Sequence, residues 1–487
     1  MKEKYSVVVA GGGLTGLAAA YSLTRAGIRT ALFERDSEVG GLSRTVLHNG
    51  FRFDLGGHRF FTKNERVNAL VRELMRGELI SVQRKSKIYM RGTYFDYPLR
   101  PFNALFGLGI PVSVRILADY CAERMKSLVR TPELVSLEDW VISRFGRTMF
   151  RIYFKEYSEK VWGLDCSRIS VDWVAQRIRG LSLAKAVRNA FFKFSGRDIP
   201  SLVDEFEYPA LGIGRISNRF REEIERGNPV FTGTGVERIH HSGSRVRSVE
   251  VRERGQTRRV ETGHFLSSMP LPALVRSLDP PPPQAVLKAA ERLRFRDLVV
   301  VAVMVDRTRV TDLTWLYLPE RKIPFGRIHE PTNWSAEMAP GGKTLLVMEY
   351  FSTEGDSLWN ERDDTLVRLT VEGLEKQGFI GREEVIDSCV VRAPKAYPLF
   401  EVGYADLCKE IYAYLARFDN LHLAGRVGMF RYYNMDHAID SGLRTAEAVA
   451  ERLAGESGGA GGEGADEEST EQEEGAAKGL SSGVGSA

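Results

Sequence analysis

The length, composition and charge of the chain indicate two or three folded domains and exclude several classes of protein. The chain has 487 residues, 43% of them hydrophobic, and a net charge of +4. Its four cysteines are far apart and form no Cys-X-X-Cys pair, so neither a disulfide framework nor a zinc site is expected. No apolar run reaches the roughly 18 residues of a membrane span. We therefore expect a cytoplasmic protein with no bound metal and no transmembrane segment.

Charge is unevenly distributed along the chain. Eight acidic residues and one lysine lie between Gly455 and Ala487, in a Gly/Ser/Glu/Ala-rich segment, so residues 456–487 are expected to form a disordered tail. The rest of the chain is correspondingly basic, as suits an anionic small molecule, a membrane headgroup or a nucleic acid. No nucleic-acid motif is present. The apolar stretch from Ala104 to Cys121 leaves contact with a membrane surface open, and nothing indicates the oligomeric state.

The first elements in chain order form a dinucleotide-binding pattern. A buried strand beginning at Tyr5 ends at Gly11-Gly-Gly-Leu-Thr-Gly16, a helix follows, and a second strand from Thr30 ends at Glu34. Gly11 permits the tight turn, Gly13 admits the pyrophosphate, and Gly16 lets the helix pack on the strand. The helix amino terminus favours phosphate, and Glu34 has the spacing of an acid that binds ribose hydroxyls. NAD(P) and FAD both fit this pattern.

The next two segments favour FAD. Gly40-Gly-Leu-Ser-Arg-Thr45 supplies a second glycine loop, which FAD needs because its diphosphate and ribityl chain extend past the first helix. Arg44 offers charge-assisted donors to phosphate. In Phe53-Asp-Leu-Gly-Gly-His-Arg-Phe-Phe-Thr62, two glycines before His58 suggest backbone packed against a flat ring, with His58 over the flavin or the substrate.

The later elements alternate between sheet and helix. A hairpin from Lys87 to Pro98 is expected to turn at Arg91-Gly92, and residues 100–195 show helical periodicity. The remaining expectations are a β-meander over Val230–Met269, a boundary at Pro280–Pro283, buried strands over Leu298–Val305 and Leu345–Tyr350, a strand and glycine turn over Asn420–Arg426, and a helix over Ile439–Leu453. Together they predict an α/β fold with a discontinuous nucleotide-binding domain.

These motifs resemble the FAD-dependent flavoproteins that include protoporphyrinogen oxidase, amine oxidases and UDP-galactopyranose mutase. GGGLTGL and FERDSEVGGLSRT are similar to the superfamily as a whole. FDLGGHRFFTKNERV, Tyr157-Ser-Glu-Lys-Val-Trp162-Gly and GRVGMFRYYNMDHAI resemble the mutase branch, up to about Leu453. Two positions depart from the mutase pattern, because Phe61 replaces a histidine and Asn434 an aspartate. Phe206-Glu-Tyr-Pro-Ala-Leu-Gly212 is more similar to the oxidase relatives.

The resemblance implies a Rossmann-like, GR2-type FAD-binding domain interrupted by an α+β substrate domain. We expect residues 1–80, 205–275 and 385–455 in the FAD-binding domain, and 81–204 and 276–384 in the substrate domain with a helical insertion. The implied catalytic residues are His58, Tyr432 and Asn434. The implied FAD-binding residues are Gly11, Gly13, Leu14, Thr15, Gly16, Glu34, Arg35, Gly41, Leu42, Ser43, Arg44, Gly57, His58, Val236, Gly425, Arg426, Met435 and Asp436.

Two reactions and two non-enzymatic roles are compatible with these residues. An oxidoreductase would pass a hydride from a polar or anionic substrate to flavin N5, and we favour it because of Phe61 and Asn434. A mutase would use reduced FAD as a nucleophile on a nucleotide sugar, whose diphosphate needs cations and whose base needs an aromatic surface. A flavin-binding partner protein or a nucleic-acid binder fits less well. The candidate substrate residues are Tyr157, Lys160, Trp162, Arg177, Arg179, Arg327, Arg431 and Tyr432.

Overall fold

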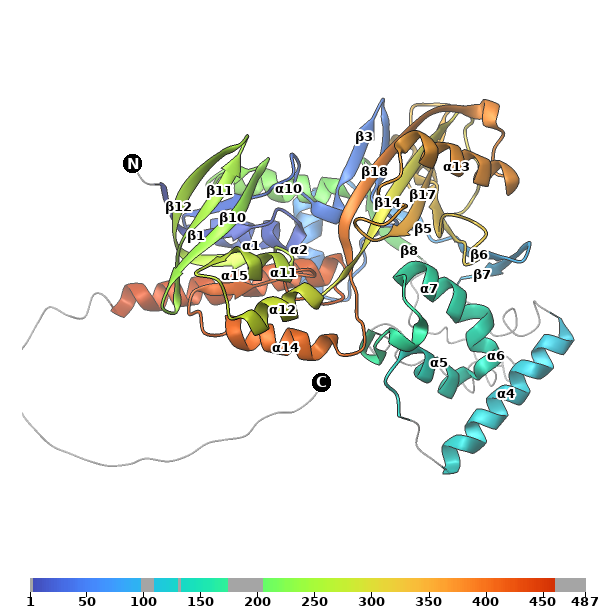
Figure 1. The fold of residues 1–487 in the computed structure, drawn as a ribbon. Helices are drawn as coiled ribbons and strands as arrows, with labels where there is room; N and C mark the ends of the chain where they lie inside the picture. Colours follow the sequence, from blue (N-terminus) through green and yellow to red (C-terminus); the bar gives the residue numbers. More distant parts are fainter. Residues whose placement is uncertain (1–2, 98–108, 130–132, 174–204, 460–487) are drawn as a thin grey trace, which may run out of the picture.

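Two large sheets organise the computed structural model, which describes residues 3–97, 109–129, 133–173 and 205–459 (Figure 1). The first sheet has eight strands in the order β13-β10-β11-β12-β1-β2-β9, with β19 paired to β12. Its strands are β1 (Glu3–Ala10), β2 (Thr30–Phe33), β9 (Val230–Phe231), β10 (Thr234–Ser242), β11 (Arg245–Glu253), β12 (Gln256–Ser267), β13 (Leu278–Asp279) and β19 (Leu421–Leu423). The strands β9, β2, β1, β12 and β19 run parallel, whereas β10, β11 and β12 form an antiparallel meander.

Helices cover both faces of the first sheet. Along β1, Val7 and Val9 pack with α1 (Leu14–Arg25), α10 (Gly214–Ile224) and α15 (Met435–Gly459), whereas Val8 and Ala10 pack with α11 (Leu271–Ser277), α12 (Gln284–Arg292) and α14 (Tyr404–Leu415). Alternate residues of a strand point to opposite faces, so a continuous apolar run marks a strand buried on both sides. The helices α1 and α15 pack closely, because a Cβ on Gly442 would collide with the Thr15 carbonyl oxygen.

The second sheet has seven strands in the order β18-β14-β17-β16-β15-β6-β7. They are β6 (Ser86–Met90), β7 (Thr93–Asp96), β14 (Phe295–Val305), β15 (Trp315–Tyr317), β16 (Arg327–His329), β17 (Thr344–Ser352) and β18 (Val385–Pro398). All residues of β14 are buried. One face of β14 packs with α13 (Asp363–Lys376) and the other with the hairpin of β3 (Thr45–His48) and β4 (Phe51–Asp54). The hairpin also contacts the start of α10, where the Gly214 N–H donates to Thr45 Oγ1 at 2.9 Å, so it connects β14 to a helix of the first sheet.

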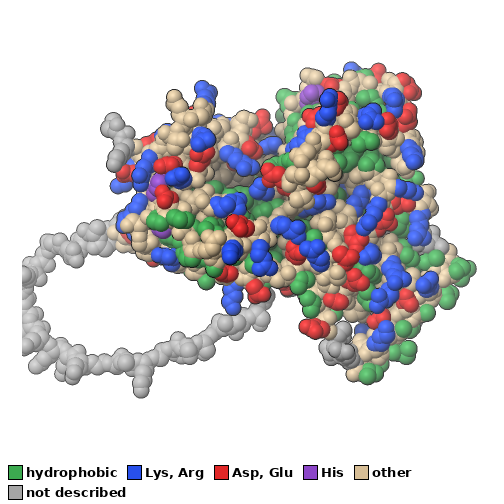
Figure 2. All heavy atoms as spheres, in the orientation of Figure 1, with side chains coloured by type: hydrophobic (Ala, Val, Ile, Leu, Met, Phe, Trp, Pro, Cys, Tyr) green, Lys and Arg blue, Asp and Glu red, His purple; other side chains and the backbone are tan. Residues whose placement is uncertain are grey.

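A helical unit covers one end of the second sheet. It contains α4 (Ile110–Val129), α5 (Leu137–Phe145), α6 (Arg147–Met149), a π-helical turn η2 (Phe150–Lys155) and α7 (Glu156–Trp162). Ser136 and Asp139 form a reciprocal capping box at the start of α5. Apolar side chains are exposed along α4, at the edge of the molecule, where Figure 2 shows them interspersed with charged ones. Among the described residues, no helix is long and apolar enough to cross a bilayer.

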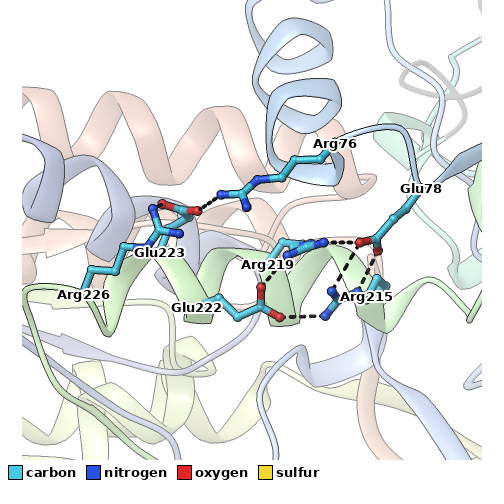
Figure 3. Close-up of polar contacts among 7 residues, drawn as sticks. All are labelled: Arg76, Glu78, Arg215, Arg219, Glu222, Glu223 and Arg226. Carbon is cyan, nitrogen blue, oxygen red and sulfur yellow. Dashed lines mark hydrogen bonds and ion pairs between the residues drawn. The ribbon is translucent and has the colours of Figure 1, made fainter.

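An ion-pair network holds α10 beside α2 (Glu65–Met75), as Figure 3 shows. Glu78 accepts hydrogen bonds from Arg215 and Arg219, and Glu222 pairs with the same two arginines. Glu223 joins Arg76, the residue after α2, to Arg226. Nearby, β5 (Leu79–Gln83) pairs with β8 (Glu205–Pro209) in a two-stranded sheet. The network therefore links two segments that are distant in the sequence, residues 76–78 and 215–226.

Most of the predicted elements are confirmed, including the α/β class, the hairpin at Arg91-Gly92 and the strands of the buried apolar runs. Three expectations need correction. Val230–Phe231 pairs with β2 instead of joining the meander, and the two strands predicted within 260–268 are the single strand β12. The last helix extends from Met435 to Gly459, so the first residues of the expected tail are helical; residues 460–487 lie outside the described part.

The division into two domains stays a prediction, but the pairing of two strands differs from it. We expected residues 385–455 to belong with the nucleotide-binding sheet. However, β18 pairs with β14 of the second sheet over most of its length. Conversely, β13, expected in the substrate domain, pairs with β10 of the first sheet. Periodicity cannot reveal this because the partner of a strand is decided by the fold, and β14 offers β18 a long antiparallel edge.

Candidate functional site

A cavity of about 1420 Å³ runs between the two sheets and the helical unit. Small-molecule pockets occupy roughly 300–1,000 Å³, so this one has room for a large cofactor and a second molecule. At one end it is lined by the first glycine turn, and at the other by aromatic side chains of the helical unit and the second sheet. The cavity therefore joins a nucleotide-type loop to an aromatic chamber.

The first glycine turn has the geometry of a phosphate cradle. Gly11 adopts a φ of +102°, which favours glycine, and a Cβ on Gly16 would collide with the Gly11 carbonyl oxygen. A Cβ on Gly13, by contrast, would meet no described atom within 4 Å, and Gly13 lines the cavity. No side chain of the described chain caps the amino end of α1, so its first N–H groups are available to an anion.

Glu34 lies at the end of β2, beside this turn. Its carboxylate accepts hydrogen bonds from the backbone N–H of Gly12 at 2.5 Å and of Asp36 at 2.9 Å. Burial raises the pKa of Glu34, while these two N–H donors oppose that change. Glu34 lines the cavity together with its neighbour Arg35 and with Val236 of β10. An acid held in this position can accept hydrogen bonds from ribose hydroxyls.

The second glycine loop lies directly against the first. The Gly40 N–H donates to the Gly12 carbonyl at 2.8 Å, and a Cβ on Gly41 would lie 3.5 Å from the Cα of Gly13. Gly40 and Gly41 have φ values of +108° and +55°, and the helical turn η1 (Gly41–Ser43) follows. Arg44 lines the cavity and forms an ion pair with Asp36 at 3.0 Å. The two loops therefore form one continuous backbone surface.

The carboxyl-terminal motif brings a constrained arginine to the same cavity. The guanidinium of Arg426 lies between the rings of Tyr397 and Tyr432, 4.8 Å from each centroid. Its Nη1 donates to the carbonyl oxygen of Tyr433 at 3.1 Å, but Nε and Nη2 are buried without a hydrogen-bond partner among the described residues. Buried donors in this state are rare in folded proteins and indicate a ligand acceptor.

His58 lines the cavity, and its surroundings keep its side chain neutral near pH 7. Burial, together with the positive charges of Arg426 and Arg327, lowers its pKa to about 4. Its Nδ1 has no hydrogen-bond partner in the described chain. Gly56, two residues before His58, has a φ of +133°. At neutral pH His58 can exchange hydrogen bonds with a ligand, but it carries no charge to stabilise an anion.

Arg327 and Glu349 form a buried ion pair at 2.5 Å in the wall of the cavity. Arg327 also donates to the hydroxyl oxygen of Tyr397 at 2.8 Å. Burial is the largest influence on Arg327 and lowers its pKa, but Glu349 and three neighbouring tyrosines together outweigh burial, so the pKa of Arg327 lies well above its usual value. Glu349 and Tyr397 were not singled out from the sequence. An acid within an otherwise apolar strand, as in Leu345–Tyr350, is the signal for Glu349, because such residues are rarely buried without a partner.

The structure brings most of the predicted site residues together, but not all of them. The residues that line the cavity are Gly11, Gly13, Leu14, Thr15, Glu34, Arg35, Gly41, Leu42, Ser43, Arg44, Gly57, His58, Tyr157, Trp162, Val236, Arg327, Arg426, Arg431, Tyr432, Asn434 and Met435. The divergent Phe61 also lines it. Gly16 and Gly425 lie behind the wall as packing residues, and Asp436 accepts a hydrogen bond from Thr62 at 3.0 Å.

Lys160 differs from expectation, and two predicted arginines lie outside the described residues. The Lys160 ammonium is buried among four backbone carbonyl oxygens rather than in the cavity wall. The family resemblance grouped Lys160 with Tyr157 and Trp162, but a helix presents its side chains in several directions. Arg177 and Arg179 lie in the part of the chain that the structure does not describe.

Comparison with known proteins identifies the family. The model of the family "Flavin containing amine oxidoreductase" matches residues 14–450. The chain belongs to this family. Its members bind flavin, and the glycine loops, Glu34 and the unpartnered donors of Arg426 fit FAD as the cofactor. The family assignment also supports an enzyme, and the fold of the two sheets and their connections agrees with it.

Individual relatives in the family carry different names. Coproporphyrinogen III oxidase of Mycobacterium leprae is 26% identical over 435 residues, which cover 84% of this chain and 91% of that protein. Protoporphyrinogen oxidase 2 of Arabidopsis thaliana is 34% identical, but over only 20% of either chain. The crystal structure of reduced UDP-galactopyranose mutase has a TM-score of 0.80 at 23% identity and covers 92% of this chain and 94% of its own. At that identity the structural likeness shows the fold alone.

Proposed function

We propose that this flavoenzyme is an oxidoreductase that removes a hydride from a polar or anionic substrate. The observation that carries the proposal is the continuity of the cavity, which extends from the two glycine loops past His58 into a chamber of aromatic side chains and arginines. Bound FAD would supply the hydride acceptor. Cofactor and substrate can therefore meet without a change in the fold.

The residues around the proposed cofactor have separable roles. The first glycine turn and the amino end of α1 would hold the pyrophosphate, Glu34 the ribose, and Arg426 an acceptor atom facing its two unpartnered N–H groups. His58 would offer a neutral hydrogen-bonding group, because its pKa is lowered to about 4. These roles require binding and orientation rather than a proton transfer by any one of these side chains.

The substrate end of the cavity favours a molecule with flat apolar faces and negative charge. The wall includes Tyr157, Trp162, Trp315 and Tyr317, and Arg431 lies in the same wall. Aromatic faces bind apolar rings, and arginine binds carboxylate or phosphate groups. Since Glu349 neutralises Arg327, the chamber is less cationic than the arginine count suggests. Reduced porphyrin precursors with carboxylate side chains satisfy these requirements, as do other anionic ring compounds.

An alternative is a mutase that acts on a nucleotide sugar. Two observations favour it: the segment Tyr157-Ser-Glu-Lys-Val-Trp162-Gly resembles the mutase branch, and both of its aromatic residues line the chamber. Against it, Phe61 and Asn434 both line the cavity, so the two departures from the mutase pattern lie where the substrate would bind. The buried pairing of Arg327 with Glu349 also leaves that arginine less available to a diphosphate.

The two reactions are separated by comparing oxidised and reduced enzyme. Oxidised, FAD-loaded protein is mixed anaerobically with coproporphyrinogen III, and its flavin absorbance is followed. With the enzyme in excess, we expect bleaching of about three flavins for each porphyrin formed, because the oxidation of a porphyrinogen to a porphyrin releases six electrons and each flavin accepts two. In parallel, dithionite-reduced protein is incubated with UDP-galactopyranose. Formation of the furanose isomer without consumption of an oxidant would contradict the proposal and support the mutase. Failure of coproporphyrinogen III alone would redirect the search to other anionic ring substrates.

A further inference from the structure

The Lys160 side chain occupies a ring of backbone carbonyl groups. Its Nζ lies 2.8 Å from the carbonyl oxygens of Leu318, Ile323 and Phe325, and 3.0 Å from that of Glu320. An ammonium group has three N–H donors, so four oxygens around it exceed the number of its directed hydrogen bonds. Rings of backbone carbonyls surround monovalent metal cations in the same way. The Lys160 ammonium therefore lies where a monovalent metal cation would lie in such a ring of carbonyl groups.

The ring closes a loop whose two ends contribute to the substrate chamber. Residues 318–325 connect β15 to β16, and these strands place Tyr317 and Arg327 in the cavity wall. Lys160 comes from α7, which places Tyr157 in the same wall. The rings of Tyr157 and Tyr317 are in edge contact, with centroids 5.8 Å apart. The ammonium group thus joins the two elements that form this part of the chamber.

A second buried cation holds the carboxyl-terminal end of α7, next to Lys160. Arg296 donates to the carbonyl oxygen of Val161 at 3.0 Å, to that of Phe351 at 2.8 Å and to Thr353 Oγ1 at 2.8 Å. The last carbonyl groups of a helix carry partial negative charge and favour a cation. A Cβ on Gly163 would lie 2.8 Å from the Arg296 Cζ, and Gly163 has a φ of +65°. Two cations bound mainly by carbonyl groups therefore fix α7.

We propose that Lys160 is a positioning residue, which acts as a tethered monovalent cation to close the 318–325 loop and to hold Arg327 beside Tyr157. The proposal rests on the proposed function only in calling the chamber a substrate site, since the ring is defined without any ligand. The proposal gives a reason for two residues of the Tyr-Ser-Glu-Lys-Val-Trp-Gly segment that do not face the cavity. Lys160 binds the carbonyl ring, and Gly163 leaves room for Arg296.

Hydrogen–deuterium exchange with chemical rescue tests this assignment. The FAD-loaded full chain is compared with Lys160→Ala, and exchange is followed in peptides that cover residues 318–326. We expect exchange in the variant to be about tenfold faster or more. Ammonium or methylammonium should restore protection because each can enter the vacated ring, whereas tetramethylammonium at equal ionic strength should not, because it has no N–H donor. Peptides from β14 should exchange as in the wild type.

Lys126→Ala is the matched control. Lys126 lies on α4 of the same helical unit, and its Nζ pairs with Glu123 at 2.8 Å. Removing it deletes the same charge without opening the ring, so exchange over 318–326 should not change. Unchanged exchange in Lys160→Ala, or equal rescue by tetramethylammonium, would overturn the proposal. Neither outcome depends on which substrate the enzyme uses, so this test is independent of the proposed reaction.

A second variant and a wild-type measurement cover the case in which Lys160→Ala does not fold. Lys160→Met keeps an apolar stem of similar length and should still loosen the 318–326 peptides. In the wild type, burial lowers the pKa of Lys160 to about 8, while the nearby Glu156 and Glu320 oppose that change. Exchange of the same peptides, corrected for the intrinsic effect of pH, should therefore accelerate as the pH rises through about 8. The tethered-cation role would be refuted if exchange of these peptides did not accelerate near pH 8 in the wild type and was unchanged in Lys160→Met.

Discussion

Gly13 and Gly16 stand three residues apart, but a side chain would meet different surroundings at each. At Gly13, φ is −72° and a Cβ would project into open space beside the cavity. At Gly16, a Cβ would collide with the backbone of Gly11. In the proposed cofactor site, only the ligand would exclude a side chain at the first position, whereas the fold itself excludes one at the second. This difference gives a direct way to test the cofactor site.

Gly13→Ala should weaken FAD binding about tenfold or more while leaving the unfolding free energy of the FAD-free protein within about 0.5 kcal/mol of the wild type. Gly16→Ala should lower the unfolding free energy by about 1–3 kcal/mol, because the new methyl group overpacks a rigid contact. Denaturant melts of FAD-free protein and FAD titration measure the two quantities. Unchanged FAD affinity in Gly13→Ala would show that the pyrophosphate does not bind at this turn.

One buried histidine, His329, makes the stability of the protein sensitive to acid. His329 of β16 is only 3% exposed, and neither ring nitrogen has a hydrogen-bond partner in the described chain. Burial, with the charge of Arg327 and the proximity of His58, lowers its pKa to about 3. The unfolded chain binds a proton more readily than the folded one, so the contribution to stability is complete above about pH 6.5 and is lost as the pH falls toward 3.

His329→Gln should therefore flatten the decline in stability between pH 6.5 and 4, where the wild type should lose about 2–4 kcal/mol through this group. His437→Gln is the control with the opposite sign. Its hydrogen bond with Asp436 raises the pKa of His437, so its contribution is present at low pH and is lost as the pH rises above 6.5. Thermal melts across this pH range measure both slopes, and identical slopes in His329→Gln and the wild type would contradict the assignment.

At the scale of elements, the contact between α1 and α15 connects the two ends of the chain. The helix α1 begins at the first glycine turn, and α15 begins directly after the motif that carries Arg426 and Asn434. Gly442 lets the helices approach, because any Cβ there would collide with the Thr15 carbonyl oxygen. Since both helices begin at the cavity, their spacing determines how the two halves of the proposed cofactor site face each other.

Gly442→Ala should consequently lower both FAD affinity and the unfolding free energy, the latter by about 1–3 kcal/mol. Gly455→Ala lies in the same helix, but a Cβ there meets nothing within 4 Å. That control should leave FAD binding unchanged and should stabilise the helix by up to about 1 kcal/mol, because alanine has the higher helix propensity. Equal behaviour of the two variants would show that the helix contact does not determine the site.

At the scale of the whole molecule, local sequence patterns predicted individual turns and strands better than they predicted which strands pair with each other. The glycine turns, the hairpin at Arg91-Gly92 and the run that became β14 are each specified by neighbouring residues, and all were predicted. The pairing of β18 with β14 joins residues far apart in the sequence, so no local pattern reveals it. Motifs of the family similarly placed most cavity residues, because they mark loops at the ends of β1, β2 and β19.

Residues whose role depends on the opposite wall were harder to predict. The ion pair of Arg327 with Glu349 and the Tyr397 hydroxyl comes from three strands, and the sequence pointed only to Arg327. Lys160 was expected in the cavity, although its ammonium lies among loop carbonyl groups that carry no side-chain signal. Backbone acceptors leave no trace in the amino-acid pattern, which is why this residue required the structure.

The flavin content of the purified chain tests the central claim, that one FAD spans the two glycine loops and the chamber, most directly. The protein is reconstituted with FAD, freed of excess cofactor and denatured, and the released flavin is identified and quantified. We predict about one FAD per chain for the wild type and a much lower content for Gly13→Ala under the same washing. A folded wild-type protein that retains no flavin after reconstitution would contradict the account.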